Sequence, residues 1–132
     1  MSGKGTRLEQ DFIAGEDLPG RIPVWLFFER KSRADSGVTT VRRLLAGPNH
    51  VGHVVGVTLR PARAGKRVPV VIMGDVLRYP HEYPGQEAWV TEYGAVLPWA
   101  QVPNNTWAVK IGLFSQVGLW VYLDFKPKRK RG

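Results

Sequence analysis

The chain has 132 residues, of which 43% are hydrophobic and 23% are charged, and it contains no cysteine. This length is typical of one domain with a sizeable core, and the composition excludes disorder of the whole chain, a disulfide framework and thiolate chemistry. The chain lacks an apolar run of about 18 residues and a signal-peptide pattern, so we expect no membrane contact and no secretion by a signal peptide.

The net charge of +8 is distributed unevenly along the chain. Residues 1–20 sum to −2, residues 21–67 to +8, residues 68–125 to −3 and residues 126–132 to +5. An excess of positive charge is typical of proteins that contact nucleic acid, acidic protein surfaces or anionic membranes. The charge alone does not choose among these partners.

Residues 1–20 show no sustained hydrophobic period and contain four glycines. We predict an extended N-terminal arm whose spaced apolar residues are its anchors. Such an arm either packs back over its own domain or reaches onto a neighbouring subunit, and the sequence favours both equally. The anchors are Leu8, Phe12, Ile13 and Leu18.

Short segments rich in β-forming residues follow the arm. Residues 22–28 form an apolar run that predicts a strand buried on both sides, and residues 38–45 predict either a strand or a short helical piece. Residues 50–59 again favour a strand. A further strand is predicted over residues 68–73, and the pair Gly74-Asp75 predicts a turn after it.

A basic loop connects the strands predicted at residues 50–59 and 68–73. Its sequence, RPARAGKR, indicates a hairpin tip with four positively charged side chains, which we expect to bind phosphate groups or an acidic surface. They are Arg60, Arg63, Lys66 and Arg67.

Residues 106–125 alternate with a period of two in two successive segments, which predicts a β-hairpin. A loop of odd length centred on Ser115 gives an all-apolar inner face, because it pairs Ile111 with Leu119 and Val109 with Val121. The outer face then carries Trp120 and Tyr122 with little charge. Such a face is usually covered, so we predict that it binds a partner.

About seven or eight short strands are predicted, one of them over residues 87–93, and no amphipathic helix is longer than two turns. This pattern favours an all-β domain over residues 21–125, either an antiparallel sandwich or jelly-roll or a small barrel. The extended arm precedes this domain, and a basic tail over residues 126–132 follows it.

The sequence offers no recognisable catalytic centre. His50 and His53 are separated by three residues, which on a strand places their rings on opposite faces, so we expect no metal site. The serines lack a nucleophile motif, and neither a phosphate-binding loop nor a dinucleotide-binding motif is present. We therefore expect neither an enzyme nor a bound cofactor.

The C-terminal sequence KPKRKRG is strongly basic. Its cations are candidates for contact with a phosphate backbone or an acidic protein surface, whereas short charged ends are more commonly solvated tails. The candidate residues are Lys126, Lys128, Arg129, Lys130 and Arg131.

Together these patterns favour a structural protein that works in a large symmetric assembly. We expect a small viral capsid cement or decoration protein, found in the virion and assembled in the host cytoplasm. Its partners would be the major shell protein and other copies of itself. A nucleic-acid-binding β-barrel is the alternative, and a carbohydrate-binding domain that uses the aromatic residues of segment 79–99 is a remote one.

Overall fold

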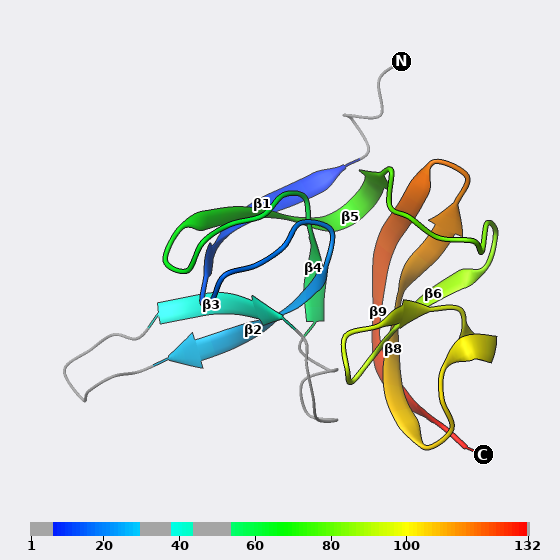
Figure 1. The fold of residues 1–132 in the computed structure, drawn as a ribbon. Coiled ribbons are helices and arrows are strands. Elements are labelled where there is room, and N and C mark those ends of the chain that lie inside the picture. Colours follow the sequence, from blue (N-terminus) through cyan, green and yellow to red (C-terminus); the bar gives the residue numbers. More distant parts are fainter. Residues whose placement is uncertain (1–6, 30–37, 44–53, 132) are drawn as a thin grey trace.

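The computed structural model of the protein describes residues 7–29, 38–43 and 54–131 (Figure 1). His50 and His53, the first six residues of the predicted arm and the final glycine of the predicted tail lie outside these ranges.

Nine strands and one short 3-10 helix make up the described chain, so the prediction of an all-β fold is confirmed. The strands are β1 (Leu8–Ala14), β2 (Pro23–Glu29), β3 (Val38–Arg43), β4 (Val54–Thr58), β5 (Arg67–Leu77), β6 (Glu87–Thr91), β7 (Val96–Leu97), β8 (Thr106–Ser115) and β9 (Gly118–Lys130), and the helix is η2 (Trp99–Gln101). Segment 38–45, for which the sequence pattern predicted either a strand or a short helical piece, contains strand β3.

Strands β1 to β5 form a closed barrel. The strands follow the order β1-β3-β2-β4-β5, and β5 pairs back with β1 to complete the ring. All neighbours are antiparallel except β1 and β3, which run parallel. Its interior is filled by small apolar side chains: Ala14, Leu18, Val24, Val41, Val68 and Val70.

A second part of the sheet continues from β5 in the order β9-β8-β6-β7 (Figure 1). A larger core joins β4 and β5 of the barrel to β6, β8 and β9. Its largest fully buried side chains are Phe114, Ile111 and Leu119. The two parts therefore share one strand and have separate cores.

The predicted turn at Gly74-Asp75 is wrong. Both residues lie inside β5, and they pair with Val121 and Trp120 of β9. Gly74 has φ of 108°, a conformation that favours glycine, so the residue adjusts the backbone without ending the strand.

The β8–β9 hairpin is confirmed, but its predicted register is wrong. Ser115 pairs with Gly118, so Gln116 and Val117 form the turn, and Phe114 lies opposite Leu119. The register then shifts twice, between Ala108 and Lys110 and between Lys110 and Gly112. These bulges change the inward-facing parity of β8, so that Phe114 joins Val109 and Ile111 in the same core.

Both ends of the described chain belong to the sheet. Residues Leu8–Ile13 pair with β5, and Leu18 forms a bridge to Ala62. The last strand continues through most of the basic segment, with Lys130 opposite Thr106 of β8. The described part of the predicted arm thus packs on its own domain.

Gly112 gives a test of the hairpin geometry. A Cβ atom there would overlap the carbonyl oxygen of Trp120, and φ is 154°. We expect Gly112→Ala to lower the free energy of unfolding by about 3 kcal/mol or more, because the backbone has to move. Gly65→Ala is the control, since its φ is 83° but the space around it is open, and it should cost about 1 kcal/mol. Equal losses in urea denaturation would contradict the bulge geometry.

Tyr79 gives a test of the larger core, against which it packs. Burial raises its pKa from 10.0 to about 12. The phenol ionises at lower pH in the unfolded chain than in the folded protein. The folded state therefore loses stability as pH rises from 10 to 12, by up to about 3 kcal/mol. Tyr79→Phe should remove this part of the pH dependence. Urea denaturation of the wild type and of Tyr79→Phe at several pH values checks this. An equal loss of unfolding free energy in the two proteins between pH 10 and 12 would contradict it.

Candidate functional site

One face of the second part of the sheet carries apolar side chains that the protein leaves partly uncovered. Cross-strand register places Leu8 beside Met73, Met73 beside Tyr122, and Trp120 beside Leu113. Partners in register share a face of the sheet. We call this surface the outer face and define it by Leu8, Met73, Leu77, Leu113, Trp120 and Tyr122.

The outer face is unusually apolar for an exposed surface. Leu8, Met73 and Leu77 are exposed by 56%, 50% and 53%, while Trp120 and Tyr122 are half-buried. The patch spans strands β1, β5, β8 and β9. Contiguous exposed apolar patches of this kind mark interaction surfaces.

Few charged groups lie on this face. Lys110 contacts Glu87 at 2.9 Å and sits over the Tyr122 ring at 5.3 Å. The hydrogen bond between them lowers the pKa of Glu87 and raises that of Lys110, so the pair stays ionised. Asp75 and Asp124 are opposite Trp120 and Lys110. Carboxylates therefore lie near Lys110, and Lys128, farther along β9, also acts on Glu87.

The four predicted arm anchors have different environments. Leu18 is only 3% exposed and belongs to the barrel core, and Phe12 packs against that core. Ile13 is half-buried and pairs with β3 and β5. Leu8 alone among the four is exposed, and it contributes to the outer face.

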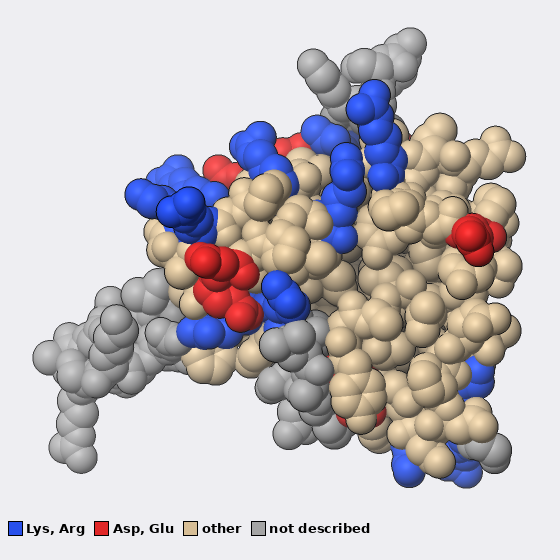
Figure 2. All heavy atoms as spheres, in the orientation of Figure 1, with Lys and Arg blue, Asp and Glu red and all other residues tan. Residues whose placement is uncertain are grey.

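The basic loop over residues 60–67 is held rigidly at its tip. Gly65 donates its N–H to the Ala14 carbonyl, Ala14 donates to the Lys66 carbonyl, and Ala64 donates to the Asp17 carboxylate at 2.9 Å. The four predicted cations are all exposed: Arg60, Arg63, Lys66 and Arg67. Figure 2 shows basic side chains gathered over the barrel, whereas the half formed by β6, β8 and β9 has few charges in this view.

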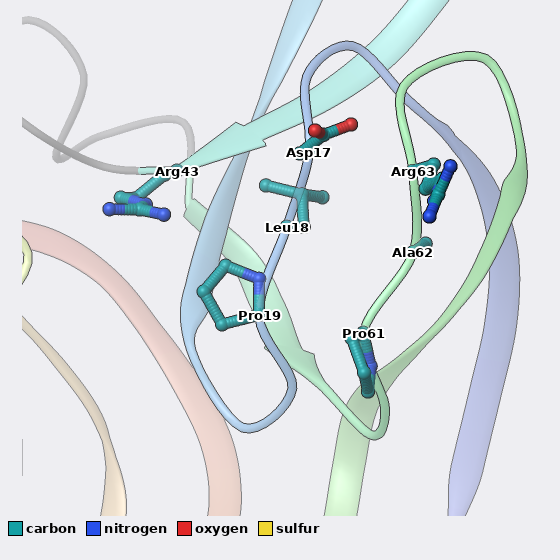
Figure 3. A pocket seen from close by; sticks show the side chains of 7 residues that line it. All are labelled: Asp17, Leu18, Pro19, Arg43, Pro61, Ala62 and Arg63. Atoms are coloured by element: carbon teal, nitrogen blue, oxygen red, sulfur yellow. The ribbon is translucent and has the colours of Figure 1, made fainter.

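A groove of about 490 Å³ lies beside this loop, between residues 17–19, residues 61–63 and β3. Figure 3 shows Arg43 on one side and Arg63 on the other, with Leu18 and Pro19 between them. Glu16 holds the turn against β3 by accepting the N–H of Arg43 at 2.8 Å. Arg43 is distant from the loop in sequence, and no local pattern indicated its role.

Two lysines of the C-terminal segment, Lys128 and Lys130, make cation–π contacts with tryptophans of the same chain. The Lys128 ammonium lies 5.5 Å from the Trp99 ring and 6.0 Å from the Trp89 ring, and Lys130 lies 5.7 Å from Trp99. Lys130 also donates to the Trp99 carbonyl at 2.7 Å. We call this cluster the tryptophan clasp. It holds the end of β9 against η2.

The arginines of the same segment are not held in this way. The register of β8 and β9 places Arg129 opposite Trp107. No carboxylate among the described residues lies within salt-bridge distance of Arg129 or Arg131. They border a second groove, of about 610 Å³, whose lining residues are Asn105, Trp107, Pro127, Lys128, Arg129 and Arg131. Lys126 is exposed.

His81, the one histidine among the described residues, makes structural contacts. His81 accepts the Tyr83 N–H at Nδ1 and therefore donates from Nε2 to the carbonyls of Ser115 and Gly118. The described residues contain no group of three or more His, Cys, Asp or Glu that could hold a metal ion. No helix in the same residues is long and apolar enough to cross a membrane.

Most aromatic residues of segment 79–99 pack inside the protein. Tyr79 and Tyr83 lie against the larger core, and Trp89 packs against Trp99 with 4.6 Å between ring centroids. Tyr93 is 63% exposed. The described rings therefore form no continuous exposed platform of the kind that a carbohydrate site uses.

Comparison of the chain with protein-family models, with curated proteins and with solved structures finds no match. Function therefore has to be inferred from the surfaces themselves.

The tryptophan clasp predicts how the C-terminal strand responds to protease. We expect Trp99→Leu to speed tryptic cleavage after Lys128 and Arg129 by about fivefold or more, because each lost cation–π contact is worth about 0.5–1 kcal/mol and cleavage follows the open population. Mass spectrometry of timed digests measures this. Trp99→Phe should cleave at an intermediate rate and Tyr93→Leu at the wild-type rate. Unchanged cleavage in Trp99→Leu would show that the clasp does not hold the strand.

Proposed function

We propose that the protein is a non-enzymatic structural subunit of a large symmetric assembly, and specifically a cement or decoration protein of a viral capsid. The observation that carries the proposal is the outer face, whose exposed leucines and methionine lie beside Trp120 and Tyr122. A stable monomer gains nothing from leaving such a patch in water, whereas a subunit buries it on assembly.

Other copies of the same chain are the partners that we propose for the outer face. Copies with a net charge of +8 repel one another, so contact is favoured where positive charge is scarce. The outer face comes close to this condition, because Lys110, the lysine that lies over the Tyr122 ring, is paired with Glu87. The closed barrel and its shared strand supply a rigid support for such a contact.

The basic loop and its groove would face a different partner. Arg60, Arg63, Lys66 and Arg67 are exposed, and Arg43 adds a guanidinium across the groove. Arginine binds carboxylates in a planar, bidentate manner, so this end of the barrel suits an acidic surface of the major shell protein. Neighbouring copies would then be joined through the outer face and fixed to the shell through the loop.

Light scattering of the purified protein tests self-association. At about 0.1 mM we expect a dimer or larger species, since a dissociation constant of about 10 µM would populate it. The apolar contact should persist at high salt, which screens charges but not the hydrophobic effect. The variants Met73→Glu and Leu77→Glu should be monomeric, because each places a charge in the contact.

Tyr93→Glu is the matched control, because Tyr93 is as exposed as these residues but lies outside the outer face. It should leave the size unchanged. A wild-type protein that is monomeric under all these conditions would contradict self-association through the outer face. So would variants at Met73 and Leu77 that assemble like the wild type.

A further inference from the structure

The alternation of lysine and arginine in the C-terminal segment separates two roles. Lys128 and Lys130 have their ammonium groups over Trp99 on one side of β9, as the tryptophan clasp shows. Arg129 and Arg131 have the opposite parity and border the groove with Trp107, and Lys128 also contributes to the groove wall. The lysines thus fix the strand, and the fixed strand presents the arginines.

The groove combines the groups that bind nucleic acid. Arg129 lies near the end of β9 and Arg131 follows directly after the strand, and both lack an ionic partner among the described residues. Trp107 lies directly across from Arg129, and although it packs against the larger core it is only half-buried, so part of its surface faces the groove. Asn105 adds an amide, and none of the described residues that line the groove carries a carboxylate.

We infer that this groove binds single-stranded nucleic acid, with Arg129 and Arg131 on successive phosphates and Trp107 stacked on a base. Positive grooves with an aromatic ring are the recurring platform for single strands, because every unpaired base offers a flat face to the ring. A duplex keeps its bases stacked and could use only the cations. An acidic peptide likewise gains nothing specific from the indole.

The sequence predicts the same kinds of partner, phosphate groups or an acidic surface, for the basic loop and for the basic tail. Figure 1 shows the loop between β4 and β5 at one end of the barrel and the C-terminus at the far end of the other half. The two grooves also share no lining residue. The inferred site is therefore local to β8 and β9, and it is independent of the proposed contacts with shell subunits.

Fluorescence anisotropy with a labelled ten-nucleotide oligothymidylate tests the inference on the full chain. Binding should weaken as salt rises from about 50 to 300 mM. The double variant Arg129→Gln/Arg131→Gln should lower affinity at least tenfold at low salt. It should also reduce the slope of log K against log salt by about 1.4, because two single-strand phosphate contacts are lost. Trp107→Phe, which keeps a smaller ring, should weaken binding by a few-fold without changing the slope.

Arg63→Gln/Lys66→Gln removes the same charge from the basic loop and is the matched control; its salt slope should equal that of the wild type. Absence of oligothymidylate binding at low salt would overturn the inference, as would equal losses in the two double variants. Equal or tighter binding of a ten-base-pair duplex, or full competition by a ten-residue polyglutamate peptide, would reassign the groove to another anionic partner. Light scattering of Arg129→Gln/Arg131→Gln separates this test from that of the proposed function, since its oligomeric state should not change.

Discussion

Strand β5 is the element on which both halves of the protein depend. Val68 and Val70 point into the barrel core, whereas Val71 and Val76 belong to the larger core on its other side. Its first part pairs with β1 and β4, and its last five residues pair with β9. A strand buried on both faces needs a continuous apolar sequence, which explains the run VPVV at residues 68–71. Displacement of β5 would expose both cores at once, so the two halves should unfold together.

The fold class and most strands could be predicted from sequence because they depend on local composition. Segments 22–28, 50–59 and 87–93 contain β2, β4 and β6, with shifts only at their ends. Residues 8–14 were not predicted as a strand because LEQDFIA does not alternate, and its place in the barrel comes from the partners that it meets. The bulges in β8 are likewise set by contacts across the sheet, such as the close approach of Gly112 to the Trp120 carbonyl. No local pattern contains that information.

The candidate surfaces also divide into those set by local sequence and those set by contacts between distant segments. Trp120, Tyr122 and the cations of the basic loop could be selected from sequence because strand parity and turn composition expose them. Arg43 could not, because its position beside Arg63 depends on how β3 lies in the barrel. The division between Lys128 and Arg129 was hidden for another reason. A proline such as Pro127 argues against a regular strand because it has no N–H to donate. The Lys130 carbonyl accepts a hydrogen bond from the β8 side, so by alternation the backbone N position of Pro127 faces away from β8. Pro127 also lies beyond the part of β9 that pairs with β5, so the missing N–H breaks no hydrogen bond between described strands.

The arrangement of charge explains how one small domain can serve partners of different chemistry. The segment with net charge −3 supplies most of the outer face, and the two strongly basic segments end at opposite ends of the molecule (Figures 1 and 2). If copies met through the outer face, as proposed, any repulsion between basic ends farther apart than the Debye length of about 8–10 Å would be screened. Each end then stays available to an anionic partner, and the apolar contact and the ionic contacts can form without competing for the same residues.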